Sequence, residues 1–293
     1  MGRALNRRRR VHEMGSTTAE RVRVTINDGV ADVRLNRPDK LNALDPAMFA
    51  AIVDAGEALK SEAGLRAVVL SGEGRGFCAG LDFSSFQAMA GGDDRTDRQP
   101  SGDRPSTADI ASMGDRITHL GQQTSWVWAE LPVPVIAAVH GVALGGGLQV
   151  ALGADIRIVA PDARLSVLEV RWGLTPDMTA TWFLPRLVGP DVAKELTFTG
   201  RMVSGEEAVR IGLATRVSDS PLDDAFELAR EIASKSPTAI RGAKRLIDAS
   251  LARTAAEQFA DERSTIGSLI GSPNQVEAVT AYFEKRDPIF GDA

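Results

Sequence analysis

Two segments near the amino terminus alternate between apolar and polar residues. RVRVTIN (residues 21–27) and VADVRLN (residues 30–36) flank the dipeptide Asp28-Gly29. Alternation at every second position is typical of a strand with one buried face, and Asp-Gly is a preferred two-residue hairpin turn. The pattern predicts a β-hairpin over residues 21–36.

A helical spacing follows this hairpin. Asp45 precedes Pro46, which is a helix start signal because an aspartate side chain can cap the first turn and proline suits the first helical position. Apolar residues then recur at helical spacing, at Phe49, Ile52, Val53 and Leu59. We expect a helix that begins at residue 46.

Start signals recur in the last third of the chain, which is predicted to be helical. Ser-Pro pairs occur at residues 220–221, 236–237 and 272–273. Ser204 with Glu207 matches a capping box, in which each of the two residues caps the other's backbone. These signals predict four helix starts.

Short apolar or β-branched runs predict buried strands in the middle of the chain. They cover residues 67–70, 135–139 and 156–159 and are bounded by Gly, Pro or Asp. Strands that alternate with helices indicate an α/β fold. We expect an α/β core over residues 21–218 and a C-terminal helical region over residues 219–293.

Two polar segments lie outside this pattern. Residues 1–20 are basic and lack an apolar period, which predicts a disordered tail; Met14 is an alternative start. Residues 89–106 are dense in Gly, Asp, Pro and Ser, which predicts a mobile surface loop. A lid over a site and a tolerated insertion are both open interpretations of that loop.

Composition and charge restrict the class of protein. The 293 residues are 43% hydrophobic and 25% charged, which is typical of a soluble globular domain. The net charge of −5 gives nucleic-acid binding little support, and no run approaches the roughly 18 apolar residues of a membrane span. The single cysteine, Cys78, fits a reducing compartment, so we expect a cytoplasmic protein. The three histidines are too scattered to suggest a metal site.

Glycine-rich turns follow two of the predicted buried strands. They are SGEGRGFCAGLD (residues 71–82) and HGVALGGGLQ (residues 140–149). Glycine permits close approach to the backbone, so such turns can present free N–H donors to an anion or a polarised carbonyl. Their glycine spacing fits neither a Rossmann fingerprint nor a Walker loop. On their own, they could equally be tight turns.

Several motifs in order resemble the enoyl-CoA hydratase/isomerase family, also called the crotonase family. They are LNRPDKLNAL (residues 35–44), GRGFCAGLDF (74–83), PVIAAVHGVALGGG (134–147), KELTFTGR (194–201), GLATRV (212–217) and FEKR (283–286). The resemblance spans residues 21–290. It implies a crotonase-like spiral of ββα repeats and a C-terminal helical trimerisation region, commonly in a hexamer. It also implies an acyl-CoA thioester as substrate and no separate cofactor, since coenzyme A is part of the substrate.

The resemblance assigns an oxyanion site to the two turns. The backbone N–H groups of Leu81 and Gly146 are the expected donors to the thioester oxygen. Proton transfer beside a thioester passes through an enolate-like state whose charge collects on that oxygen. Each such donor is worth roughly 2.7–4 kcal/mol of transition-state stabilisation.

The acid/base positions depart from the pattern of family hydratases. Those enzymes carry two glutamates, and here the first position is Gln149 while the second, Glu169, is retained. Because an amide cannot exchange a proton, hydration should lose about 10²- to 10⁴-fold of general acid/base help, and double-bond isomerisation fits better. Asp177, eight residues after Glu169, resembles a second carboxylate of dienoyl-CoA isomerases.

Alternatives stay open for this site. Asp177 could instead cap the helix expected near residue 179. A hydratase that uses Glu169 alone is the second hypothesis for the reaction. A non-catalytic acyl-CoA-binding or RNA-binding relative is the third.

Residues for coenzyme A follow from the same resemblance. Lys40, Ala43, Leu44 and Ala79 match segments that contact coenzyme A. Lys285 matches a lysine that reaches a coenzyme A phosphate, often across a subunit interface. A solvated surface position is the competing interpretation for both lysines.

Overall fold

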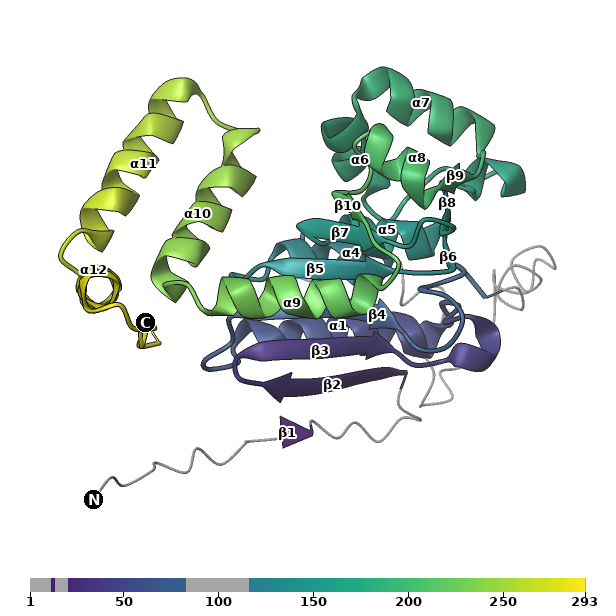
Figure 1. Ribbon diagram of the computed structural model, residues 1–293. Helices are drawn as coiled ribbons and strands as arrows, with labels where there is room; N and C mark the ends of the chain where they lie inside the picture. The colour runs from purple at the N-terminus through teal and green to yellow at the C-terminus, as the bar shows by residue number, and fades with distance from the viewer. Residues whose placement is uncertain (1–11, 14–20, 83–115, 293) are drawn as a thin grey trace.

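The computed structural model of this chain describes residues 12–13, 21–82 and 116–292 (Figure 1). The predicted loop over residues 89–106 lies outside the described residues. So does the predicted 1–20 tail, apart from the two-residue strand β1 (His12–Glu13), whose backbone pairs with the edge of the main sheet.

A seven-stranded sheet forms the centre of the part of the chain that the structure describes (Figure 1). Its strand order is β1-β2-β3-β4-β5-β7-β10. The predicted hairpin is confirmed, because β2 and β3 pair antiparallel around Asp28-Gly29. The predicted buried strands are confirmed as β4, β5 and β7. The bounds are β2 Val22–Asn27, β3 Val30–Leu35, β4 Ala67–Gly72, β5 Val135–Val139, β7 Ile156–Val159 and β10 Arg216–Val217.

Five neighbouring strands of this sheet run parallel, so their carboxyl ends meet at one edge of the sheet. The parallel strands are β3, β4, β5, β7 and β10. The two glycine-rich turns follow β4 and β5 and therefore leave from this edge. The segment after β3 leaves there too and contains the short helix η1 (Pro38–Lys40). Three separate stretches of sequence thus converge where ligands typically bind in open α/β sheets.

Helices cover both faces of the sheet, which explains why its central strands β4 and β5 are almost entirely apolar. Along β4, Val68 and Leu70 point to the core beneath α1 and α4, whereas Ala67 and Val69 point to the opposite face. There α9 packs on the sheet, with Ala225 and Ala229 against it (Figure 1). These helices are α1 Pro46–Lys60, α4 Leu120–Ala129 and α9 Pro221–Ala233.

A smaller, three-stranded sheet and short helices extend the core beyond the carboxyl edge. The strands are β6 Val142–Leu144, β8 Arg164–Ser166 and β9 Val203–Ser204, in the order β6-β8-β9. The helices are α5 Gly146–Leu152, η2 Glu169–Trp172, α6 Ala180–Val188, α7 Pro190–Thr199 and α8 Gly205–Arg210. Both α5 and η2 begin at residues that the sequence assigns to the site.

The predicted helix starts are confirmed, and the predicted caps only in part. Asp45 accepts from Met48 N at 2.8 Å, and Ser272 caps its helix in the same way. Ser204 accepts from Glu207 N, but the capping box is incomplete because the Glu207 carboxylate pairs with Arg201 at 3.0 Å. The helices after residues 220 and 236 begin where expected without a side-chain cap.

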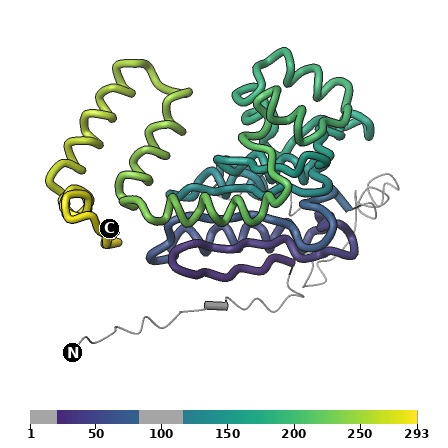
Figure 2. Tube along the Cα trace, viewed as in Figure 1, coloured from purple at the N-terminus to yellow at the C-terminus, as the bar shows by residue number. Residues whose placement is uncertain are grey.

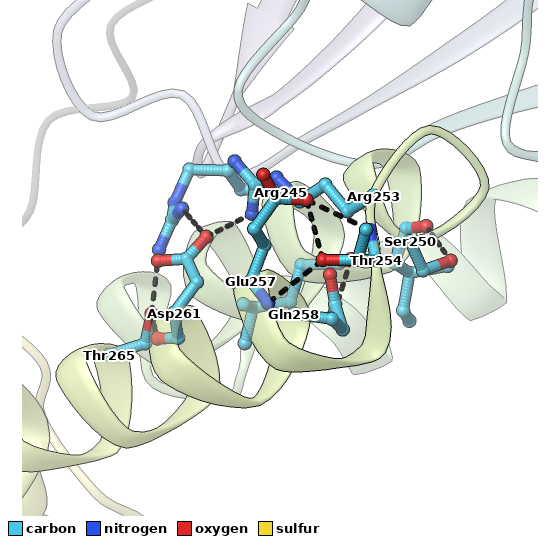
Figure 3. Close-up of polar contacts among 10 residues, drawn as sticks. Arg245, Ser250, Arg253, Thr254, Glu257, Gln258, Asp261 and Thr265 are labelled. Carbon is cyan, nitrogen blue, oxygen red and sulfur yellow. Dashed lines mark hydrogen bonds and ion pairs between the residues drawn. The ribbon is translucent and has the colours of Figure 1, made fainter.

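The last three helices, α10 Pro237–Ser250, α11 Ala255–Leu269 and α12 Pro273–Glu284, stand beside the core rather than over the sheet (Figure 2). A polar cluster joins α10 to α11 (Figure 3). Within it, the Asp261 carboxylate accepts from both Arg245 and Arg253, and Arg245 also donates to Thr265 Oγ1 at 2.6 Å. No helix in the described part of the chain is long and apolar enough to cross a membrane.

Candidate active site

Backbone hydrogen bonds align the first glycine-rich turn with the start of the second. Cys78 N donates to Val142 O at 2.9 Å, and Leu144 N donates to Cys78 O at 3.0 Å. On the other side, Leu44 N donates to Gly80 O at 2.7 Å, and Asp82 N donates to Leu44 O at 3.0 Å. Residues 78–82 therefore run as a short extended segment between residue 44 and β6.

This pairing decides where the two expected oxyanion donors point. Leu44 and Leu81 form a parallel bridge, in which Leu44 bonds to residues 80 and 82, so the Leu81 N–H faces the opposite side, towards β6 and α5. Gly146 is the first residue of α5, and a helix offers no internal acceptor to its first N–H groups. Both residues are half-exposed. The structure thus brings the two donors together.

Glycine is required at the two positions that shape this site. Gly80 has φ of +86°, and a Cβ there would lie 2.5 Å from Leu144 O and 3.6 Å from Gly146 N. Gly145 has φ of +50°, and its Cβ position lies 3.4 Å from Glu169 Oε1. The same turn that exposes the Gly146 N–H therefore approaches the carboxylate of Glu169.

Asn42 holds the segment after β3 against the first turn, and sequence reasoning missed it. Its buried amide donates to Glu73 O and Gly76 O, both at 2.9 Å, and accepts from Arg37 N at 2.7 Å. Its φ is +56°, a conformation that asparagine tolerates better than most residues. An asparagine within LNAL was the available signal.

Glu169 is the first residue of η2. Its carboxylate is buried, and only one of its two oxygens has a hydrogen-bond partner among the described residues. Oε1 accepts from Gln149 Nε2 at 2.6 Å, whereas Oε2 is buried without a hydrogen-bond partner among the described residues. Burial raises the pKa of this carboxyl above its ordinary value, and the charge of Asp177 raises it further. The hydrogen bond from Gln149 opposes that rise. Oε2 is thus the oxygen suited to accept a proton.

Gln149 lies on α5, three residues after Gly146. Its Oε1 accepts from Met178 N at 2.9 Å and from Ala180 N at 3.0 Å. Because only the amide oxygen can accept these bonds, the amide nitrogen must face Glu169. The structure joins the two sequence-predicted positions, residues 149 and 169, by direct contact.

Asp177 lies near Glu169 but is exposed, and it influences Glu169 through its charge. The alternative in which Asp177 caps the following helix is wrong, because the N-cap of α6 is Thr179, which forms no side-chain cap. Helix capping therefore does not explain why an aspartate stands at position 177.

The residues expected to contact coenzyme A divide into two groups. Lys40 is exposed in η1, while Ala43 and Leu44 are buried and Ala79 is half-buried, with Ala79 N bonded to Leu41 O. These four border the glycine turns. Lys285 follows α12, and the nearby Asp292 pairs with Arg66 at 2.6 Å, at the amino end of β4. Within one chain, α12 lies at the opposite end of the sheet from α5 and β6 (Figure 1).

A cavity of about 260 Å³ lies away from the glycine turns, α5 and η2. It is lined by residues 59–65 with Arg241 and Asp292. None of the residues that the sequence assigns to the site lines this cavity. The hydrogen bonds and the convergence of the two turns, rather than that cavity, locate the candidate active site.

Comparison with known proteins agrees with this geometry. The family model described as enoyl-CoA hydratase/isomerase matches residues 30–289. The mitochondrial Delta(3,5)-Delta(2,4)-dienoyl-CoA isomerase of Mus musculus is 33% identical over 96% of this chain and 84% of its own length. A short-chain-enoyl-CoA hydratase of Clostridium acetobutylicum is 34% identical over 88% of this chain and 92% of its own length.

A solved structure shows the same fold. The crystal structure of an enoyl-CoA hydratase from Bacillus anthracis superposes with a TM-score of 0.79 at 30% identity and covers 92% of this chain and 98% of its own. The crotonase-like fold expected from the sequence is confirmed.

Proposed function

Because the chain belongs to the enoyl-CoA hydratase/isomerase family, we propose that it isomerises fatty enoyl-CoA thioesters, with Glu169 moving a proton along the acyl chain. The family acts on acyl-CoA thioesters. The finer assignment, isomerisation rather than hydration, depends on the contact between Glu169 and Gln149.

The first step is removal of a proton from C2 of a 3-enoyl-CoA. The Glu169 carboxylate accepts this proton on Oε2, and the electrons of the C–H bond delocalise through the C3–C4 double bond and the carbonyl into a dienolate. The Leu81 and Gly146 N–H groups donate to the thioester oxygen, where the negative charge collects. The protonated Glu169 then returns the proton to C4, which leaves a 2-enoyl-CoA and regenerates the carboxylate.

The single observation that supports isomerisation is the state of the Gln149 amide. Its oxygen accepts from two backbone N–H groups and its nitrogen donates to Glu169, and an amide neither takes up nor releases a proton near neutral pH. Water addition needs a proton acceptor for the water and a proton donor for the acyl carbon, which two carboxylates can share. A proton shift needs only one group that takes and returns the same proton.

Asp177 extends the reaction to a conjugated substrate. With a 3,5-dienoyl-CoA, removal of the C2 proton by Glu169 gives a trienolate. The proton passes from Glu169 through water to Asp177, which delivers it to C6; this gives the 2,4-dienoyl product and returns both carboxylates to their ionised state. C6 lies farther along the chain, so a second acid is useful there. Asp177 is exposed, close enough to influence Glu169 by its charge, and free of a capping role.

Hydration is the second candidate, because the similar proteins include hydratases as well as isomerases. In this alternative, Glu169 alone would accept the proton of water and deliver a proton to the acyl carbon.

Product analysis separates the two candidates. The purified protein is incubated separately with a 3-enoyl-CoA, a 3,5-dienoyl-CoA and crotonyl-CoA, and the products are identified by chromatography and ultraviolet absorbance. We expect conjugated products from the first two substrates, little hydration of crotonyl-CoA, and loss of turnover in Glu169→Gln. Rapid hydration without isomerisation would contradict the proposal, as would full activity of the variant.

We also propose that the protein assembles as a trimer or a hexamer through α10, α11 and α12. These helices expose large apolar side chains, among them Ile247, Phe259, Ile266, Tyr282 and Phe283. A neighbouring copy could then supply Lys285 to a coenzyme A phosphate, because within one chain α12 lies at the opposite end of the sheet from α5 and β6 (Figure 1). Light scattering coupled to size-exclusion chromatography tests the assembly, and a monomer at micromolar concentration would contradict it.

A further inference from the structure

We propose that Gln149 is a positioning residue, which fixes the orientation of the Glu169 carboxylate so that only Oε2 is presented to substrate. This inference rests on the proposed function for its catalytic consequence. Its structural content, that the amide of residue 149 controls the carboxylate of residue 169, stands on the contacts alone.

The amide of Gln149 has one possible orientation. Two backbone N–H groups, from Met178 and Ala180, converge on Oε1 at 2.9 and 3.0 Å. Rotating the amide by 180° would place an NH₂ group against these two donors and leave both without an acceptor in a buried environment. The NH₂ group is therefore directed at Glu169.

This orientation makes the two oxygens of Glu169 different. Oε1 accepts from Gln149 Nε2 at 2.6 Å, a short bond of the kind formed to an ionised acceptor. Oε2 has no partner among the described residues, although it is buried. Burial raises the pKa of Glu169, and the donation from Gln149 is one of the contacts that oppose this rise.

The same contacts connect the base to the oxyanion site. Met178, whose N–H binds Gln149, packs against Gly146, with its Sδ 2.9 Å from the Cβ position of that glycine. Between the two bonded N–H groups lies Thr179, a β-branched residue with φ of +79°, which is an unfavourable conformation. The hydrogen bonds from Met178 N and Ala180 N to Gln149 stabilise the backbone on both sides of Thr179. Gln149 thus links the base, the turn and one oxyanion donor.

Two substitutions at position 149 test the proposal. Gln149→Met keeps the length of the side chain and adds no charge, but it removes both the donor and the acceptor. Gln149→Glu keeps an oxygen for Met178 and Ala180 and replaces the donating nitrogen by a second carboxylate oxygen, which also adds a negative charge beside Glu169; it is the variant expected to fold if the first does not. Gln123→Met is the matched control, because Gln123 is also buried and donates to Glu130 at 2.7 Å, outside the site.

The measurements are the pH dependence of kcat/KM for a 3-enoyl-CoA and the titration of the Glu169 carboxyl carbon by ¹³C NMR, assigned with Glu169→Gln. In both variants at position 149 we expect the midpoint of the pH–rate profile and the midpoint of the NMR titration to move to higher pH. At pH 7, kcat/KM should fall about 10- to 100-fold in Gln149→Met, as expected for loss of a hydrogen bond to a charged group. The control should leave both midpoints unchanged.

A purely structural role would give a different result. Gln149→Met would then lower stability without moving either midpoint, and that outcome would overturn the proposal, as would unmoved midpoints in Gln149→Glu. The NMR titration needs no substrate. Failure of the proposed function, seen as no turnover in the native protein, is thus distinguishable from failure of this inference, seen as an unmoved Glu169 titration.

Discussion

A methyl group on Gly80 would lie 2.5 Å from the carbonyl oxygen of Leu144, so the first glycine turn can approach β6 only because residue 80 has no side chain. The contact is with backbone, which cannot rotate away. The close approach also brings the Cβ position of residue 80, which precedes Leu81, to 3.6 Å from Gly146 N.

Gly80→Ala should separate the two oxyanion donors. We expect kcat to fall about 10²- to 10³-fold, the usual effect of losing one such donor, and stability to fall by roughly 1–2 kcal/mol from the positive φ alone. Gly267→Ala is the control: Gly267 lies in α11 with nothing within 4 Å of its Cβ position, so this change should stabilise the protein by about 0.5–1 kcal/mol. Steady-state kinetics and urea unfolding measure both effects. Normal kcat in Gly80→Ala would refute the oxyanion assignment.

Glu169→Gln should lose activity and gain stability in a pH-dependent way. Turnover should fall about 10²- to 10⁴-fold because the amide cannot take the proton. The native pKa of Glu169 is raised by burial, so its ionisation in the folded state costs stability at neutral pH and none below the pKa of the unfolded chain. The variant should therefore exceed the native protein in stability at pH 8 and match it near pH 4.

Urea unfolding at several pH values measures this difference. The control is Glu231→Gln, at an exposed position of α9, for which we expect no comparable pH-dependent gain. A stability gain for Glu169→Gln that is constant across pH would show that the buried charge is not its origin.

Asp177→Asn should shift the acid limb of kcat/KM for a 3-enoyl-CoA to lower pH. The negative charge of Asp177 raises the pKa of Glu169, so its removal lowers that pKa, opposite to the change expected at Gln149. With a 3,5-dienoyl-CoA, turnover should also fall about 10²- to 10⁴-fold if Asp177 is the acid at C6. Comparing pH–rate profiles for the two substrates tests both effects, and equal rates on the dienoyl substrate would remove Asp177 from the mechanism.

Asp261→Asn should weaken the junction of α10 and α11 (Figure 3). Hydrogen bonds from Arg245 and Arg253 lower the pKa of Asp261 from 3.8 to about 2, so its contribution to stability is present above pH 4 and is lost as the pH falls towards 2. The native protein should be more stable than the variant at pH 6, with the difference shrinking on acidification. Thermal unfolding measures it, and Glu262→Gln, at the next and exposed position, is the control.

The sequence by itself determined most of the local structure. The hairpin around Asp28-Gly29 and the start of α1 at Pro46 depend on neighbours within a few positions, so the pattern of residues suffices to predict them. The motifs also identified the family and the two glycine turns. Whether a capping box is completed depends on competing partners, as Arg201 shows by pairing with the Glu207 carboxylate.

Only the tertiary structure decided how the site is organised. The Gln149 amide is oriented by backbone groups 29 and 31 residues further along the chain, and Asn42 binds backbone 31 and 34 residues away. No local pattern carries such contacts, because they arise when parallel strands bring distant loops to one edge of the sheet. Sequence thus supplied Glu169 as the proposed base, and the packing of α5 against the turn before α6 determined which of its two oxygens has no hydrogen-bond partner among the described residues.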